Sequence, residues 1–156
     1  MKRRTYLMPV RMSDVLEIYR DTSRSHRGKL AEAVDFLFVK NNGDFSVEGR
    51  PVFAAAKGVV FRIQSESTAG GPLKRFWFAG NYISIRHGHN EYTHYEHLKP
   101  QGVLVRNGQR VSAGQLIGYS GNTGYTLLSH LHFERFRYDG TGEHETLPVR
   151  FRDSSI

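Results

Sequence analysis

The chain has 156 residues, a formal net charge of +7 at neutral pH and no cysteine. This length fits one domain better than two, and a globule of this size buries enough surface to fold without disulfides. The lack of cysteine excludes a disulfide framework, thiol catalysis and every cysteine-ligated metal site, so a transition metal would have to be held by His, Asp and Glu.

The basic balance, 22 Lys and Arg against 15 Asp and Glu, favours anionic partners such as nucleic acid, membranes or phosphate-rich wall polymers. The arginines are scattered, and no nucleic-acid-binding motif accompanies them. We therefore expect no specific nucleic-acid partner. The basic residues either bind anionic wall polymers or simply form a solvated surface. The sequence has no stretch apolar enough to span a membrane. Its basic start is not followed by the apolar run that a signal peptide requires.

Short alternating runs, frequent turn signals and 16 glycines predict a mainly β, single-domain fold. The segment 12–20 fits either a helix capped by Ser13 or an irregular strand. Strands are expected at 31–39, 52–56, 58–64, 81–87, 92–98 and 130–138, with short ones around 103–105 and 116–119. Asn41–Asp44 predicts a turn and 65–72 an exposed loop, and 74–79 fits a short strand.

The sharpest candidate site is His130-Leu131-His132. Alternate side chains of a strand share a face, so the two imidazoles should point the same way about 6–7 Å apart. They could hold one metal ion and its water between them without both binding the ion. Two hydrogen-bonded histidines at a sheet edge are the alternative. Glu134 would project on the same face, either to orient an imidazole or as a surface acid.

Asp35 places a carboxylate in the otherwise apolar run 33–39, nine residues after His26. An isolated buried carboxylate is very costly, so a metal, hydrogen bonds or a partner charge should accompany it. A structural salt bridge with an arginine is the alternative to a metal site.

Strict alternation along 92–98 puts His97 on the face of Tyr95 and His94 on the opposite face. An imidazole at the end of a strand suits proton transfer, and a surface histidine is the alternative. The remaining histidines are expected to be structural (His87) or solvated (His89, His94 and His144).

Taken together, a series of motifs in one order resembles the lysostaphin-type zinc endopeptidases. The motifs are Ser25-His26-Arg27-Gly28, Ala33-Val34-Asp35-Phe36, the segment 49–60, Ile85-Arg86-His87-Gly88, Tyr95-Glu96-His97-Leu98, the segment 107–118, Ser120–Gly124 and His130–Glu134. The resemblance runs from about Ser25 to Glu134. It implies a fold around a central antiparallel β-sheet, like the duplicated hybrid motif, with a metal in a groove across it.

The same resemblance implies one Zn²⁺ per chain, held by His26, Asp35 and His132, with His97 and His130 as the catalytic histidines. Two imidazoles and one carboxylate leave the fourth position of a tetrahedral zinc ion open, as in catalytic zinc sites. The implied activity is hydrolysis of peptide cross-links in peptidoglycan, which favours the cell envelope or secretion. A non-catalytic domain that binds or activates a cell-wall hydrolase is the alternative.

Three features depart from the family pattern, and they bear on the choice of substrate. Thr126–Ser129 stands where Thr-Gly-Pro is frequent, Arg50 replaces a usual Thr, and the loop 65–79 is long. We expect an N-terminal extension (1–24) packed on a catalytic domain (25–150), with a tail at 151–156.

Overall fold

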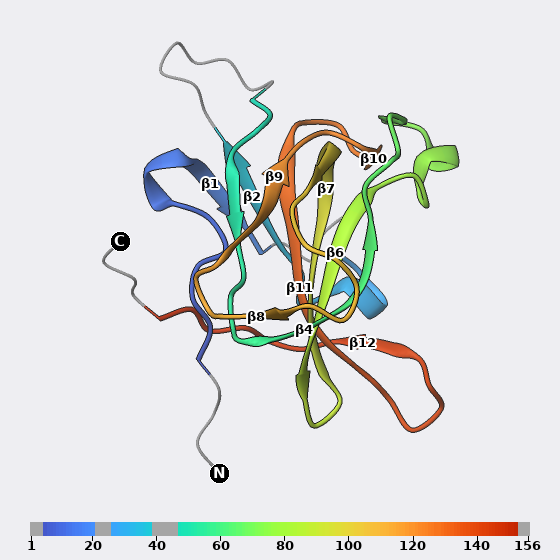
Figure 1. Cartoon of the computed structure of the whole chain (residues 1–156). Coiled ribbons are helices and arrows are strands. Elements are labelled where there is room, and N and C mark those ends of the chain that lie inside the picture. Colours follow the sequence, from blue (N-terminus) through green and yellow to red (C-terminus); the bar gives the residue numbers. More distant parts are fainter. Residues whose placement is uncertain (1–4, 21–25, 39–46, 153–156) are drawn as a thin grey trace.

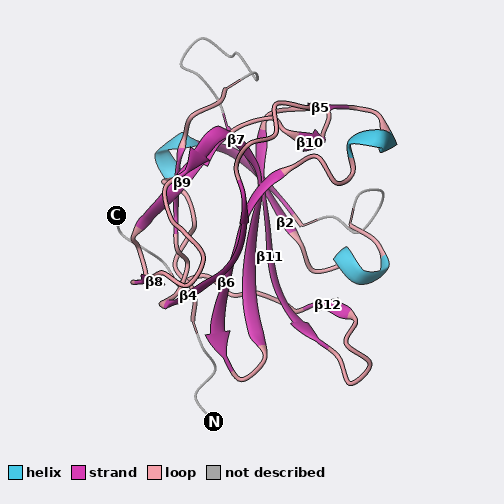
Figure 2. Ribbon diagram, turned by 45° about the vertical axis from the view of Figure 1, so that its right-hand side comes forward, coloured by secondary structure: helices cyan, strands magenta, loops and turns pink. Residues whose placement is uncertain are grey.

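The computed structural model describes residues 5–20, 26–38 and 47–152, and within them it consists mainly of β-strands (Figures 1 and 2). The strands are β1 (Val15–Tyr19), β2 (Val34–Phe38), β3 (Pro51–Phe53), β4 (Gly58–Gln64), β5 (Gly70–Gly71), β6 (Asn81–Gly88), β7 (Glu91–Val103), β8 (Arg110–Val111), β9 (Leu116–Ser120), β10 (Gly124–Tyr125), β11 (His130–Tyr138) and β12 (His144–Thr146). Three short 3-10 helices are η1 (Met12–Asp14), η2 (Gly28–Leu30) and η3 (Lys74–Phe76). In this described part, no helix has the length and apolarity needed to cross a membrane.

The main sheet is antiparallel, with strand order β1-β2-β11-β7-β6-β4-β8. Outside this path, β12 pairs with β11, and β9 pairs with both β3 and β7. Figure 2 shows β6, β7 and β11 running side by side through the centre of the molecule. The register puts His132 of β11 directly opposite Asp35 of β2 on one side and Glu96 of β7 on the other.

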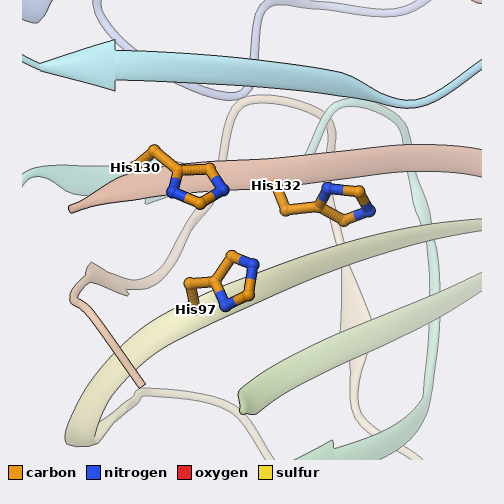
Figure 3. A group of neighbouring side chains, drawn as sticks. All are labelled: His97, His130 and His132. Carbon is orange, nitrogen blue, oxygen red and sulfur yellow. The ribbon is translucent and has the colours of Figure 1, made fainter. Parts of the chain in front are cut away.

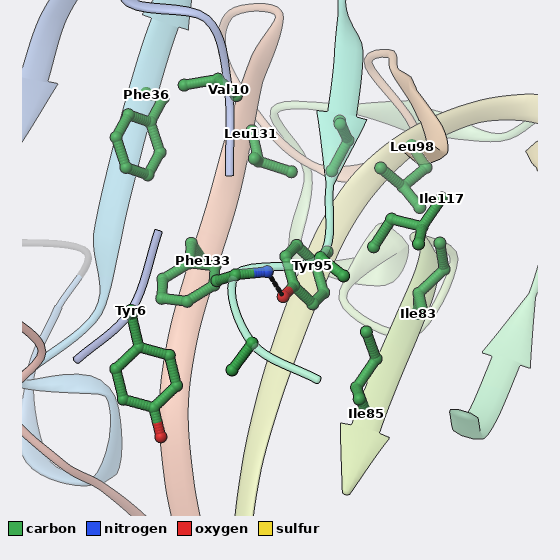
Figure 4. Close-up of a cluster of buried hydrophobic side chains, with 14 of the residues drawn as sticks. Tyr6, Val10, Phe36, Ile83, Ile85, Tyr95, Leu98, Ile117, Leu131 and Phe133 are labelled. Atoms are coloured by element: carbon green, nitrogen blue, oxygen red, sulfur yellow. Dashed lines mark hydrogen bonds between the residues drawn. The ribbon is translucent and has the colours of Figure 1, made fainter. Parts of the chain in front are cut away.

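The hydrophobic core covers one face of this sheet (Figure 4). Alternate residues of β2, β6 and β11 point into it, because side chains alternate between the two faces of a strand, and an irregularity in β7 puts Leu98 on the same face as Tyr95. They are Phe36 on β2, Leu131 and Phe133 on β11, Tyr95 and Leu98 on β7, and Ile83 and Ile85 on β6. Tyr6 and Val10 of the N-terminal segment are buried in the same core. Burying one such large side chain stabilises the fold by about 1.5–3 kcal/mol.

A row of hydrogen bonds crosses the core at Tyr95. The backbone N–H of Ala55 donates to the Tyr95 hydroxyl at 2.8 Å, as the dashed line in Figure 4 shows. Thr93 Oγ1 lies 3.1 Å from the same hydroxyl and 2.8 Å from His87 Nε2, while His87 Nδ1 donates to the Lys57 carbonyl. Burial raises the pKa of Tyr95 to about 12, so this hydroxyl stays neutral. The predicted structural role of His87 is therefore confirmed.

Most of the predicted strands are confirmed, and two of them, 58–64 and 130–138, have the predicted bounds. The segment 12–20 is a 3-10 turn followed by strand β1, which decides between its two alternatives. The expected strand at 74–79 is wrong, because backbone N–H groups in that segment bond to carbonyls three residues earlier and form η3. The predicted turn Asn41–Asp44 lies outside the described residues.

Candidate metal centre

The structure brings all five predicted site residues together on the sheet face opposite the core. Asp35 comes from β2, His97 from β7, and His130 and His132 from β11, while His26 comes from the loop before η2. Ligand atoms of His26, Asp35 and His132 all lie within 4.8 Å of one another. The same is true of His97, His130 and His132, whose rings face a common space in Figure 3.

Asp35 is the shared partner of three imidazoles. Its neighbours Val34 and Phe36 are buried in the core, so the alternation of β2 turns Asp35 to the other face. His132 Nδ1 lies 2.8 Å and His130 Nε2 3.7 Å from Asp35 Oδ1, and His26 Nε2 lies 3.1 Å from Oδ2. Burial alone would raise the pKa of Asp35. The hydrogen bond from His132 and the nearby His26 ring outweigh burial and hold it well below its usual range. The partners of this carboxylate are therefore histidines, not the arginine of the alternative interpretation.

His26 gives the clearest sign that a ligand belongs at this centre. The side chain is 2% exposed, and neither ring nitrogen makes a hydrogen bond within the described part of the chain. Nε2 lies 3.1 Å from Asp35 Oδ2, but the contact does not have the geometry of a hydrogen bond. A buried polar atom without a partner costs about 1–3 kcal/mol. A metal ion would satisfy this nitrogen, and two imidazoles with one carboxylate are a donor set that fits zinc.

His132 is held at both ring nitrogens. Nδ1 faces Asp35, and Nε2 lies 2.7 Å from Glu134 Oε1. Burial would lower the pKa of His132, but the hydrogen bonds to Asp35 and Glu134 raise it well above its usual value in the metal-free protein. Glu134 is 3% exposed, so the interpretation of this residue as a surface acid is wrong.

His97 does not lie on the face that strict alternation predicts. Its neighbours Glu96 and Leu98 pair with consecutive residues of β6, so His97 is an extra residue in β7, which makes a β-bulge. Its backbone is left-handed, with φ of +64°. The bulge turns the ring away from Tyr95 and the core and toward the metal centre. The centroid of the His97 ring lies 5.9 Å from that of the His132 ring. The predicted shared face with Tyr95 is therefore wrong.

The two remaining histidines, His97 and His130, are fixed in the same tautomer. Carbonyl oxygens only accept hydrogen bonds, so the Nδ1–H of His97 donates to Thr123 O and that of His130 donates to Leu128 O, each at 2.7 Å. Their ring centroids are 4.5 Å apart. Burial, together with the nearby charge of His130, lowers the pKa of His97 to about 4, and burial also lowers the pKa of His130. Both rings are therefore neutral near pH 7, with unprotonated Nε2 atoms.

The segment 126–129, which departs from the family motif, holds His130 in place. Leu128 provides the carbonyl for Nδ1, and Thr126 Oγ1 lies 3.3 Å from the same nitrogen. Leu127 is 79% exposed and Leu128 47% exposed, so this support comes from a loop that presents apolar side chains to solvent.

Two histidines that were expected to be solvated are built into the same face of the sheet. His94 lies 2.7 Å from Ser84 Oγ and 3.3 Å from Glu96 Oε2, and His144 lies 2.7 Å from Glu134 Oε2. Burial would raise the pKa of Glu96, but His94 lowers it to about 2. His94 and Glu96 are two residues apart on one strand and therefore share a face, so the sequence did indicate that these two side chains could pair. Nothing in the sequence pairs His144 with Glu134.

Comparisons with known proteins point in one direction. The model of peptidase family M23 matches residues 40–144. The peptidoglycan DD-endopeptidase ShyA of Vibrio cholerae serotype O1 is 41% identical over 95 residues, which cover 60% of this chain and 19% of that protein. The chain thus spans about a fifth of the length of this curated relative.

Solved structures agree. The catalytic domain of lysostaphin from Staphylococcus simulans matches with a TM-score of 0.50 and 31% identity, over 68% of this chain and 66% of that one. A zinc-containing peptidase from Vibrio cholerae matches with a TM-score of 0.61 over 96% of this chain and 41% of that one. At 24% identity, this second likeness is one of fold.

Proposed function

Because this chain belongs to peptidase family M23, we propose that it is a zinc-dependent endopeptidase that hydrolyses peptide bonds in peptidoglycan cross-links. One zinc ion would be held by His26, Asp35 and His132. The observation that carries the proposal is the buried His26 imidazole, which has no hydrogen bond to any described residue although it lies 3.1 Å from a carboxylate that is held anionic. The neutral rings of His97 and His130 beside this centre supply the groups for proton transfer.

Zinc at such a site supplies Lewis acidity and makes water acidic enough to give a nucleophile near neutral pH. The chain itself supplies the proton path. Since the Nδ1–H groups of His97 and His130 are engaged by carbonyls, each Nε2 can accept the proton that the attacking water loses. The imidazolium formed in this way can stabilise negative charge on the scissile carbonyl oxygen and then deliver the proton to the leaving amine.

The relatives support peptidoglycan as the proposed substrate. ShyA is named a peptidoglycan DD-endopeptidase and is 41% identical to this chain over the matched residues. The net charge of +7 would also attract the protein to anionic wall polymers, an effect that should weaken as salt is added. Wall polymers would in this case concentrate the enzyme at its substrate without entering the reaction.

The test combines metal content with product analysis. We expect the purified protein to bind about one zinc ion per chain and to release muropeptides from peptidoglycan, with products identified by mass. His132→Ala should lose both zinc and activity, whereas His130→Ala should keep zinc and lose activity. The proposal is wrong if the wild-type protein binds no zinc or if the His132 variant still digests peptidoglycan. A zinc-free protein that stimulates another cell-wall hydrolase would establish the non-catalytic alternative instead.

A further inference from the structure

We infer that Glu134 and His144 are a positioning pair for zinc binding: Glu134 fixes the ring of His132, and His144 fixes Glu134. The inference rests on the proposed function, since it concerns a proposed zinc ligand. It extends the functional residues to strand β12, beyond the last motif that carries the family resemblance.

The first observation is that both oxygens of a buried carboxylate are engaged by imidazoles. Glu134 Oε1 lies 2.7 Å from His132 Nε2, and Oε2 lies 2.7 Å from His144 Nε2. An ionised carboxylate only accepts hydrogen bonds, so both rings donate an Nε2–H to it. For neutral His132, a proton on Nε2 leaves the lone pair on Nδ1. That nitrogen is the one beside Asp35, where the metal is proposed. When zinc takes the place of the proton between Nδ1 and Asp35, Glu134 would keep the remaining proton on Nε2 and so hold His132 in the tautomer that can bind zinc.

The second observation is that packing holds the His144 ring. Strand β12 pairs with the end of β11, with His144 opposite Tyr138. The His144 ring stacks on Phe136, with centroids 4.2 Å apart and planes 16° apart, and Phe136 stacks in turn on Tyr92 at 5.0 Å and 16°. The stack holds the plane of the His144 ring in an orientation in which Nε2 lies 2.7 Å from Glu134 Oε2. The carboxylate of Glu134 therefore has two fixed donors rather than one.

The third observation is that β12 also contacts the segment that follows His26. Lys29 of η2 forms an ion pair with Glu143, and the backbone N–H of Glu32 donates to Thr146 Oγ1 at 3.2 Å. The turn before β12 is closed by Asp139, whose Oδ1 accepts bonds from the backbone of Thr141 and Glu143. The hairpin thus supports β11 on one side and the His26 segment on the other.

Zinc affinity, measured by competition with a chromophoric chelator, tests the pair directly. Loss of a partner that orients a metal-binding histidine costs about 10–100-fold in metal affinity, so Glu134→Ala and His144→Ala should weaken zinc binding by that factor. His144→Gln can still donate an N–H to Glu134 and should recover most of the affinity. The matched control is Glu145→Gln, which breaks an exposed 2.8 Å pair with Arg137 in the same hairpin and should bind zinc as the wild type does.

A second readout separates positioning from general stability. In ¹⁵N spectra of the zinc-loaded protein, the His132 ring should show a slowly exchanging Nε2–H that disappears in Glu134→Ala. Unchanged zinc affinity in folded Glu134→Ala and His144→Ala would overturn the inference. Equal losses in His144→Ala and Glu145→Gln would also overturn it, as would a His144→Gln variant no better than His144→Ala. Failure of the wild-type protein to bind zinc would instead refute the proposed function.

Discussion

Replacing Gly124 with alanine should both destabilise the protein and disturb His97. Gly124 has a φ of +87°, and a Cβ there would lie 2.8 Å from Gly80 Cα and 3.2 Å from His97 Nδ1. An L-residue in a left-handed conformation costs about 1–2 kcal/mol. Overpacking against backbone adds about 1–3 kcal/mol. We therefore expect Gly124→Ala to lower the free energy of unfolding by about 2–5 kcal/mol.

Gly108→Ala is the matched control for this prediction. Gly108 has nearly the same φ, +82°, but a Cβ there would meet no atom within 4 Å. Only the backbone cost of about 1–2 kcal/mol should remain. Urea unfolding of both variants under one set of conditions separates the two contributions. Since a small misplacement of a reacting group can cost about 100-fold in rate, peptidoglycan hydrolysis should fall strongly in Gly124→Ala only. Equal losses of stability, or full activity in Gly124→Ala, would refute the steric argument.

Two further predictions concern the core and the site. Tyr95→Phe removes the acceptor of the buried Ala55 N–H and should cost about 1–3 kcal/mol in urea unfolding, and a neutral result would show that another acceptor replaces it. Burial lowers the pKa of His97 from its usual 6.5 to about 4. Between these two pH values the unfolded chain binds more protons than the folded one, so the free energy of unfolding of the zinc-free protein decreases as the pH is lowered. Between pH 6.5 and 5 the wild-type protein should lose about 1.5 kcal/mol more than His97→Gln, because the imidazole of the unfolded chain is already half protonated at pH 6.5. Parallel losses in the two proteins would contradict the assignment.

The alternation of side chains was enough to predict the strands and one side of the site. His130 and His132 share a face because they are two residues apart on a strand, and this holds whatever the strand pairs with. The meeting of Asp35 with His132 depends on the register between β2 and β11, which are far apart in the sequence. The spacing of residues along the sequence does not reveal how these two strands align. Only the family resemblance indicated that Asp35 and His132 would meet.

His97 and His144 mark the limit of pattern-based prediction. A β-bulge at His97 shifts the alternation by one residue, so His97 leaves the face of Tyr95 and Leu98, three residues after Tyr95, joins it in the core. His144 gains its role from a short hairpin strand whose pairing no periodicity reveals. Both are tertiary effects, which local propensity and alternation do not report.

The position of β2 has a practical consequence for any attempt to shorten this protein. The family model begins its match at residue 40, whereas His26 and Asp35 precede it. A fragment trimmed to that boundary would lose two of the three proposed zinc ligands. It would also strip the neighbour from one side of β11, because β2 lies between β1 and β11. The strand that carries His130 and His132 would then be left with unpaired backbone groups along one edge, which invites association with other chains. A safe cut has to lie ahead of Tyr6, because Tyr6 and Val10 are buried in the core and β1 covers the outer edge of β2.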